Sequence, residues 1–141
     1  MRDEKGFTLI ELIIVIAIIG IIAGIAVAQL QTAPQRARES VLKEDLYAIR
    51  DVIDQYFADK GKYPESLDTL VDGVEKTGAL GQKIKFLRRI PIDPMTKTKD
   101  WGLRSYQDDA DSNSWGHENV YDVYTNSQGK ALDGKTFYKD W

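Results

Sequence analysis

The apolar and polar positions divide the chain into two segments of different character. Residues 7–28 are apolar except at Thr8 and Glu11, and the rest of the chain is polar and charged. A helix rises about 1.5 Å per residue, so this apolar run is long enough to span the roughly 30 Å hydrocarbon core of a bilayer. The pattern predicts a membrane-spanning helix at residues 7–30, followed by a soluble domain at residues 31–141.

A second periodicity follows the apolar run. Beyond Pro34, apolar residues recur at spacings of three and four with charged residues between them, as on an amphipathic helix. The pattern predicts a helix at residues 35–58 that continues the first helix and buries one stripe in a core. Gly61 suits the end of that helix, and Pro64 suits the first turn of a short helix at residues 64–71. The predicted stripe consists of Leu42, Leu46, Ile49, Ile53 and Phe57.

From residue 83 onward, the sequence is typical of short strands joined by turns. Candidate antiparallel strands lie near Lys83–Ile90, Leu103–Gln107 and Asn119–Tyr124, and the last of these alternates best between its two faces. Residues 83–141 are therefore expected to form a β-sheet with loops. The predicted fold class is α+β: a long N-terminal α-helix, membrane-spanning in one half and amphipathic in the other, with a small C-terminal antiparallel β-sheet headpiece.

Composition and charge exclude several classes of protein. The chain has 141 residues, 43% of them apolar, and a formal net charge of -3, which favours one globular domain over a disordered chain or a nucleic-acid binder. With no Cys and a single His, His117, it has no disulfide framework, thiolate zinc site or His-rich metal site. It also lacks the G-x-S-x-G and H-E-x-x-H motifs. We expect neither an enzyme nor a nucleic-acid partner.

The N-terminal string resembles a known processing signal. The residues Lys5-Gly6-Phe7-Thr8-Leu9-Ile10-Glu11, followed by the apolar run, are similar to the class III leader of type IV pilins and type II secretion pseudopilins. The resemblance implies that residues 1–6 are a prepilin leader, that a dedicated peptidase cleaves between Gly6 and Phe7, and that the new N-terminal Phe7 is methylated.

Two other interpretations of this segment remain open. An ordinary secretory signal would be cleaved after Ala26-Val27-Ala28 and release a soluble domain that begins near Gln29. A simple single-pass anchor would keep the segment, but Glu11 would then be an expensive carboxylate inside it. The apolar run is longer than the usual 7–15 residues of a signal peptide, which favours a retained helix.

The spacing of four residues between Phe7 and Glu11 allows the two to interact after cleavage. Cleavage would convert the Phe7 nitrogen into a protonated amine, and residues four apart lie on one face of a helix. In an apolar medium either charge alone is costly, so the amine and the carboxylate can pair within or between chains. The resemblance implies that Glu11 of an incoming subunit meets the Phe7 amine of its neighbour and sets the register of a filament. A carboxylate that reaches the lipid headgroups is the alternative.

Two later motifs narrow the resemblance to one class of pseudopilin. The residues Gly61-Lys62-Tyr63-Pro64-Glu65-Ser66-Leu67 follow the long predicted helix, and Arg89-Ile90-Pro91-Ile92-Asp93-Pro94 precede a Trp. Both are similar to the G-type major pseudopilins of type II secretion. The implied function is that of a structural filament subunit, which polymerises into a periplasmic pseudopilus and drives protein export. The alternatives are a type IV pilin for adhesion, motility or DNA uptake, and a signal-peptide-cleaved periplasmic binding domain.

The resemblance also implies partners and a location. The partners are further copies of the chain, minor pseudopilins, the inner-membrane assembly platform and the prepilin peptidase. The location is the bacterial inner membrane, crossed once with the N-terminus cytoplasmic and the C-terminal domain periplasmic, before extraction into the filament. The charges alone do not decide this orientation, because the cations Arg2 and Lys5 before the apolar run are matched by Arg36, Arg38 and Lys43 after it.

Three residues mark a weak stretch of the predicted helix. Gly20 and Gly24 each cost roughly 0.8–1.0 kcal/mol relative to Ala in a helix interior, and Pro34 costs about 3 kcal/mol. The family often has a Pro about six residues earlier, where this chain has Ala28. Pilin-like filaments often lose helix in this region, which predicts a break between about Gly24 and Pro34 in the assembled state.

The charged residues of the headpiece leave two questions open. A basic run (Lys83, Lys85, Arg88, Arg89) and an acidic run (Asp108, Asp109, Asp111) are either solvated faces or lateral contacts between subunits. Calcium is the one candidate cofactor, because G-type pseudopilins bind it in C-terminal loops and the acidic run offers oxygen ligands beside Asn113 and Ser114. This chain has Tyr124-Thr125-Asn126-Ser127 where the family has a Leu-Gly-Ala run before an Asp, and Asp133 is the candidate ligand that remains.

Overall fold

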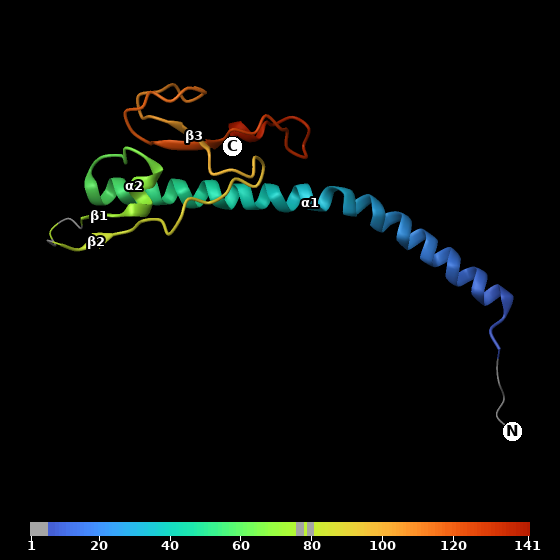
Figure 1. The fold of residues 1–141 in the computed structure, drawn as a ribbon. Helices are drawn as coiled ribbons and strands as arrows, with labels where there is room; N and C mark the ends of the chain where they lie inside the picture. The colour runs from blue at the N-terminus through green and yellow to red at the C-terminus, as the bar shows by residue number, and fades with distance from the viewer. Residues whose placement is uncertain (1–5, 76–77, 79–80) are drawn as a thin grey trace. The chain divides into compact units, whose positions relative to one another are not determined.

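The computed structural model describes residues 6–75, 78 and 81–141. The predicted leader therefore lies, apart from Gly6, outside the described residues. The chain divides into two compact units, the first ending at Arg36 and the second covering Ala37–Trp141. The described elements are α1 (Leu9–Lys60), α2 (Leu67–Asp72), β1 (Val74–Glu75), β2 (Lys83–Ile84), β3 (Trp101–Arg104), β4 (Asp122–Thr125) and the 3-10 helix η1 (Tyr138–Asp140) (Figure 1).

The long helix predicted from the two apolar patterns is confirmed. α1 has 52 residues and continues through Gly20, Gly24 and Pro34. It begins two residues later than predicted, because Thr8 caps it, and it ends at Lys60, where Gly61 takes a positive φ of 69°. The single chain therefore contains no break at these three residues. The break predicted for the assembled state is a different matter and stays a prediction.

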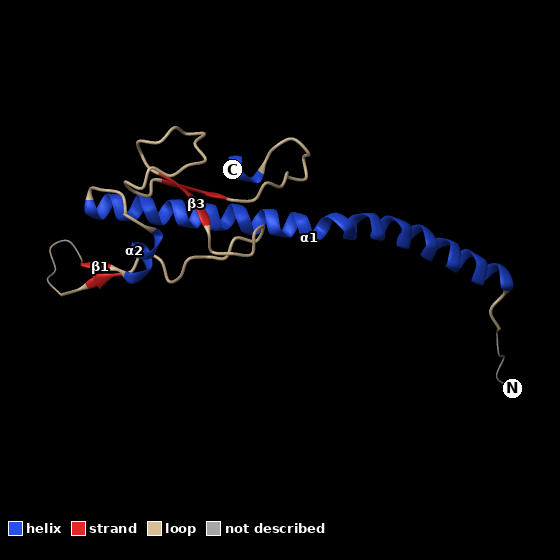
Figure 2. Cartoon of the chain, turned by 45° about the horizontal axis from the view of Figure 1, so that its top comes forward, coloured by secondary structure: helices blue, strands red, loops and turns tan. Residues whose placement is uncertain are grey.

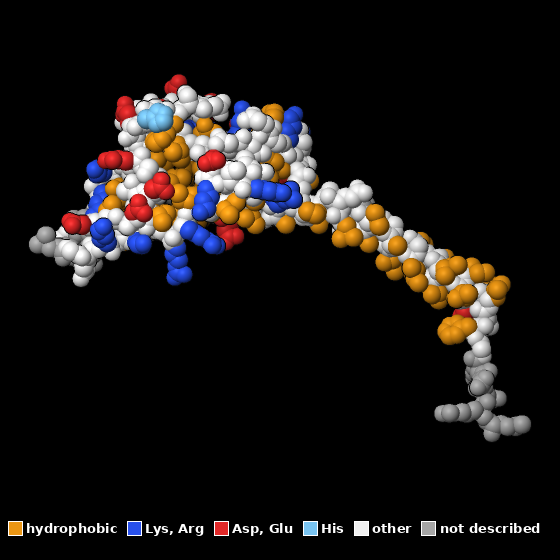
Figure 3. Space-filling view, in the orientation of Figure 1, with side chains coloured by type: hydrophobic (Ala, Val, Ile, Leu, Met, Phe, Trp, Pro, Cys, Tyr) orange, Lys and Arg blue, Asp and Glu red, His pale blue; other side chains and the backbone are white. Residues whose placement is uncertain are grey.

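The first part of α1 is apolar on all its faces. The large apolar side chains between Phe7 and Leu30 are each 43–83% exposed, and Figure 3 shows them along this part of the helix. The most apolar 18-residue window of α1 has a mean hydropathy of 3.0, and among the described residues α1 is the helix long and apolar enough to cross a membrane. A helix that is apolar all round is stable only where lipid or protein covers it.

The second part of α1 supports the core of the second unit. Leu42, Leu46, Ile49 and Ile53 are at most 2% exposed, as the periodicity predicts. The prediction for the fifth stripe position is wrong, because Phe57 is 42% exposed and the step of three to Tyr56 continues the buried stripe instead. The other buried apolar side chains that join this core are Leu67, Leu70, Trp101, Val120, Val123, Ala131 and Tyr138.

Two separate two-stranded antiparallel sheets pack near this stripe (Figure 2). β1 pairs with β2 through Val74 and Ile84, and β3 pairs with β4 from Trp101 opposite Thr125 to Arg104 opposite Asp122. In Figure 1 the two sheets lie on opposite sides of α1. The predicted α+β class is confirmed, but with two small sheets in place of one.

The strand boundaries differ from those predicted because several backbone amides in these segments donate hydrogen bonds to groups outside the two sheets. The predicted strand at residues 83–90 stops at Ile84, since the Phe86 and Leu87 amides donate to the Leu70 carbonyl. The predicted strand at residues 103–107 lies at Trp101–Arg104, and the Asp108 carboxylate binds the next amide, that of Ser105. The predicted strand at residues 119–124 begins only at Asp122, because the Val120 amide donates to the Pro64 carbonyl.

The short helix predicted at residues 64–71 is confirmed with shifted ends. The Ser66 hydroxyl accepts a hydrogen bond from the Thr69 amide, so Ser66 and not Pro64 marks the start of α2. Gly73 follows the last residue of α2 with a φ of 82°, and a Cβ at this glycine would lie 2.9 Å from the Ile84 carbonyl oxygen. A glycine is therefore required where α2 turns into β1.

Candidate functional site

The predicted cleavage point lies outside any helix or strand. Gly6 and Phe7 precede α1, no heavy atom approaches within 4 Å of a Cβ built at Gly6, and the Phe7 side chain is 83% exposed. A protease needs a peptide bond in an extended, unprotected segment. The local structure of this junction is therefore compatible with cleavage between the two residues.

Thr8 and Glu11 form a capping box at the start of α1. The Thr8 amide and hydroxyl both donate to Oε2 of Glu11, at 3.3 and 3.2 Å, and the Glu11 amide donates to the Thr8 hydroxyl at 3.3 Å. This reciprocal arrangement satisfies two backbone donors that a helix start otherwise leaves open. The sequence pattern Thr-x-x-Glu contains this signal, although no role for Thr8 is among the predictions above. The Glu11 carboxylate consequently has hydrogen-bond donors within its own chain.

The three residues of the predicted break make no packing contact that requires them. No heavy atom approaches within 4 Å of a Cβ built at Gly20 or Gly24, and both lie in an exposed part of α1 with Pro34. Pro34 has no amide hydrogen, so the helix lacks its hydrogen bond to the Leu30 carbonyl. In the described part of the chain, no packing contact at Gly20 or Gly24 offsets their low helix propensity.

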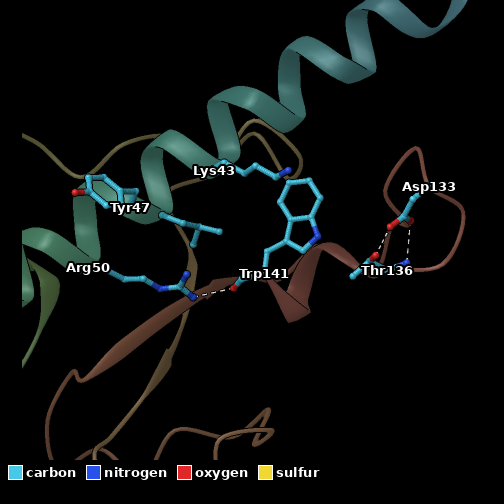
Figure 4. Close-up of a pocket in the computed structure, with 7 residues that line it drawn as sticks. Lys43, Tyr47, Arg50, Asp133, Thr136 and Trp141 are labelled. Carbon is cyan, nitrogen blue, oxygen red and sulfur yellow. Dashed lines mark hydrogen bonds between the residues drawn. The ribbon is translucent and has the colours of Figure 1, made fainter.

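A second candidate site lies between α1 and the end of the chain. A pocket of about 480 Å³ is lined by α1 and by the segment that follows β4. Figure 4 shows the Lys43 side chain pointing towards the Trp141 ring, with Asp133 and Thr136 on the other side of the pocket. The Lys43 ammonium lies 4.4 Å from the centre of that ring, a distance typical of a cation–π contact. The lining residues are Lys43, Leu46, Tyr47, Arg50, Asp133, Thr136 and Trp141.

Arg50 joins three separate parts of the second unit. Its guanidinium donates to Oδ1 of Asp122 at 2.7 Å, to the Val123 carbonyl at 3.0 Å and to the Trp141 carbonyl at 2.8 Å. Asp122 also accepts from Arg104 at 3.1 Å, so one carboxylate binds two guanidinium groups. Planar, charge-assisted contacts of this kind fix geometry as well as adding energy. Arg50 is not among the residues predicted from the sequence, because nothing local in the sequence indicates partners 72 to 91 residues away.

Asp133, the candidate calcium ligand, uses its carboxylate within its own turn. Oδ1 accepts from the Lys135 amide at 2.8 Å and from the Thr136 amide at 2.9 Å, and Oδ2 accepts from the Thr136 hydroxyl. The hydrogen bond from the Thr136 hydroxyl, those from the two amides and the nearby Lys43 charge hold the pKa of Asp133 below its usual value. Calcium needs six to eight oxygen ligands, and this carboxylate is already satisfied without it.

The acidic run does not gather around a common point either. Oδ2 of Asp108 accepts from the Ser105 amide at 2.7 Å and from the Gly116 amide at 3.1 Å, which closes the loop after β3. These hydrogen bonds hold the pKa of Asp108 below its usual value. Across residues 6–75, 78 and 81–141, no three His, Asp or Glu side chains are placed together as a metal site requires. The residues present do not fit the implied calcium site.

The two charged runs lie on different sides of the second unit. In Figure 1 the segment with the basic run follows β2 below α1, whereas the loop with the acidic run lies above α1. In Figure 3 Lys and Arg side chains are frequent along the lower edge, with others at the upper right, and Asp and Glu side chains are spread over the visible face. Lys83, Lys85, Arg88 and Arg89 are exposed, as are Asp109 and Asp111.

A cluster of four aromatic rings also lies at the surface, and the sequence analysis did not foresee it. Tyr63 stacks on Phe57 at 4.5 Å and on Tyr106 at 5.8 Å, and it meets Tyr121 edge to face at 5.2 Å. Phe57, Tyr106 and Tyr121 are 42%, 64% and 44% exposed. Partial burial and the neighbouring Tyr121 and Asp54 raise the pKa of Tyr63. Such a surface is suited to contact with another protein chain.

Asp45 is a partly buried acidic residue of α1 that lines another pocket. It lines a pocket of about 560 Å³ with Ala48, Arg89 and Ile90. Burial raises its pKa, and the negative charges of Glu44 and Asp93 raise it further. The ionised form of Asp45 is therefore less favourable in the folded chain than in water.

Comparison with known proteins gives one consistent result. Residues 1–27 match the family model described as the prokaryotic N-terminal methylation motif. A protein of Pseudomonas aeruginosa is 36% identical over 98 residues, which cover 66% of this chain and 69% of the relative. A protein of Klebsiella pneumoniae is 31% identical over 99 residues, 67% of this chain and 71% of the relative. A protein of Vibrio cholerae is 29% identical over 131 residues, which cover 89% of this chain and 81% of the relative. All three are named type II secretion system core protein G. No solved structure matches the chain.

We expect Asp45→Asn to stabilise the second unit at neutral pH. The folded pKa of Asp45 lies above the unfolded value, so at pH 7 the charge disfavours folding, and below about pH 3 both states are protonated and the effect disappears. The melting temperature should rise by about 1–2 °C at pH 7, a small change because solvent screens a partly exposed charge. Thermal unfolding followed by Trp circular dichroism measures it.

The control for this prediction is Asp109→Asn, which removes a carboxylate from an exposed loop and should leave the melting temperature unchanged. A lower melting temperature for Asp45→Asn at pH 7 would mean that the ionised carboxylate supports the fold, contrary to its raised pKa.

Proposed function

The chain belongs to the type II secretion system core protein G family, and from this we propose that it is the major pseudopilin of such a system. In this proposal the mature chain is an inner-membrane subunit that polymerises into a periplasmic filament and drives folded proteins through an outer-membrane channel. The observation that carries the proposal is the start of the chain, where an accessible Gly6–Phe7 junction precedes a helix that keeps a carboxylate at Glu11.

The exposed apolar helix supports assembly into a filament. The large apolar side chains between Phe7 and Leu30 are at least 43% exposed. In the membrane, lipid covers these side chains. After extraction they need the same helices of neighbouring subunits as their cover, because burial of each such side chain contributes about 1.5–3 kcal/mol. Polymerisation supplies that cover.

The charged runs of the second unit support a repeating contact between copies. The exposed basic run and the exposed acidic residues Asp109 and Asp111 lie on different sides of the unit, so one copy's basic side can face the next copy's acidic side (Figure 3). Such a contact joins two different surfaces, so it repeats from copy to copy and gives an open helical polymer wherever the rotation between copies does not close a ring. Electrostatic complementarity of this kind sets register and association rate more than affinity.

The proposal includes the partners and the orientation implied by the family. The N-terminus is cytoplasmic, the second unit is periplasmic, and the partners are the prepilin peptidase, the inner-membrane assembly platform and minor pseudopilins. The chain acts as a structural subunit and carries out no reaction. A type IV pilin has the same N-terminal segment and is the alternative within this structural class.

We expect the mature protein to begin at Phe7 and to carry one added methyl group. Intact mass spectrometry of the protein purified from membranes of the native host measures both. Gly6→Leu should leave the full-length precursor in the membrane, because a bulky side chain blocks the position before the cleaved bond. Val27→Leu, which introduces the same residue near the other candidate cleavage point, serves as the control and should mature normally. A mature terminus at Gln29 would instead identify a secreted binding domain.

We expect Glu11→Leu to insert into the membrane normally and to lower filament yield by at least about tenfold. Each subunit contact would lose a hydrogen bond to a charged group, which is worth about 1.5–3 kcal/mol. Sedimentation of sheared filaments measures the yield, and carbonate-resistant membrane protein measures insertion.

The matched control is Glu11→Gln, which keeps the capping box with Thr8 and removes the charge. If the charge sets the register, Glu11→Gln should assemble as poorly as Glu11→Leu. Normal filament yield from Glu11→Gln would assign the role of Glu11 to helix capping and would contradict the proposed pairing with the Phe7 amine.

We expect the helix to open between about Gly24 and Pro34 when the subunit enters the filament. The bilayer protects this weak stretch in the free subunit, since unsatisfied backbone groups are costly in hydrocarbon, and extraction removes that protection. Pro34→Ala should restore helix and give stiffer or poorly formed filaments. Cryo-electron microscopy of the wild-type filament tests this directly, and a continuous helix from Gly24 to Pro34 would be the opposite result.

A further inference from the structure

The segment after β4 has the position at which the family resemblance implies calcium, but its residues do not form a calcium site. Both carboxylate oxygens of Asp133 accept hydrogen bonds from its own turn, through Lys135 and Thr136. Among the described residues no acidic group joins it in a metal-binding set. A segment of this length still needs something to hold it on α1, because its ordering costs about 1–2 kcal/mol of backbone entropy per residue.

We infer that side chains of α1 hold residues 126–141 of this chain in the place of calcium. Three of them contact the segment from one side of the helix: Glu39, Lys43 and Arg50. The inference concerns the folding of the second unit alone, so it does not depend on whether the chain forms a filament.

Glu39 provides the acceptor that anchors the middle of the segment. Its Oε1 accepts a hydrogen bond from the Leu132 amide at 2.8 Å and another from the Tyr138 hydroxyl at 2.9 Å. Tyr138 is 4% exposed and belongs to the core, so this contact joins the loop, η1 and α1 at one carboxylate. A hydrogen bond that involves a charged group is about twice as strong as a neutral one.

Lys43 places a positive charge in the pocket that Asp133 lines. Its ammonium lies over the Trp141 ring at 4.4 Å, and Asp133 lies on the other side of the same pocket (Figure 4). A divalent cation bound in this pocket would share it with the Lys43 ammonium, and the two positive charges would repel each other.

Arg50 fixes the end of the segment. It donates to the Trp141 carbonyl at 2.8 Å while it also binds Asp122 and the Val123 carbonyl on β4. The residues that lead from β4 to Trp141 are therefore attached at both ends to one side chain of α1. With Glu39 between these two ends, the segment has three separate attachments to the helix.

Thermal unfolding of the full-length chain in detergent tests the inference. We expect the same melting temperature in EGTA and in millimolar CaCl2, within experimental error. We also expect Glu39→Ala and Lys43→Met to lower the melting temperature by several degrees in both buffers, since each removes an attachment that calcium does not replace. The matched controls are Glu118→Ala and Lys62→Met, which remove exposed charges of the same kinds and should leave it unchanged.

Two further measurements keep the inference testable if a variant fails to fold. Hydrogen exchange of the wild-type chain should show a slowly exchanging Leu132 amide with and without calcium. Terbium luminescence sensitised by Trp reports a cation bound near Trp141, and we expect no saturable emission. A melting temperature that rises by several degrees with calcium would overturn the inference, as would saturable terbium emission that Asp133→Asn abolishes. Unchanged stability of both Glu39→Ala and Lys43→Met would also overturn it.

Discussion

The buried stripe of α1 is the interaction on which the second unit depends. A two-stranded sheet is marginally stable in water by itself, and this unit contains two of them on different sides of one helix. Leu42, Leu46, Ile49 and Ile53, each at most 2% exposed, provide the apolar surface on which the strands and α2 are buried. The helix is therefore the organising element of the unit, and the strands remain short because they pack on it more than on one another.

Polar contacts then fix the positions of the loops around α1, which the apolar contacts with the stripe do not determine. Apolar contacts are not directional, whereas the three acceptors of Arg50 and the two donors to Glu39 are. Asp93 has the same role near β3 and β4, since it is fully buried and accepts from the Met95 amide and the Thr125 hydroxyl. Apart from the local bond between Met95 and Asp93, these contacts join residues 32 to 99 positions apart in the chain. They select one arrangement of the loops around the helix.

The sequence predicts what is periodic and local, and less of what is distant. The long helix, four of five stripe positions, the α+β class and the secretion family could all be predicted, because each depends on spacing or on a contiguous motif. The fifth stripe position could not, since the alternatives Tyr56 and Phe57 are both aromatic and differ by one residue. Glu39, Lys43 and Arg50 resembled ordinary solvated charges of a helix surface, because their partners follow many residues later. The roles of Gly6, Phe7, Glu11, Gly20, Gly24 and Pro34 in processing and assembly stay predictions.

The capping box at Thr8 and Glu11 affects how the Glu11 carboxylate can meet another chain. Both donors from Thr8 bind Oε2 of Glu11, which holds this side chain against the start of α1 in the single chain. A carboxylate has a second oxygen that also accepts hydrogen bonds, so a neighbour's amine can bind without displacing the cap. Because the side chain is already ordered, such a contact loses less conformational entropy than a contact with a freely rotating side chain. The cap therefore prepares the carboxylate for one direction of approach.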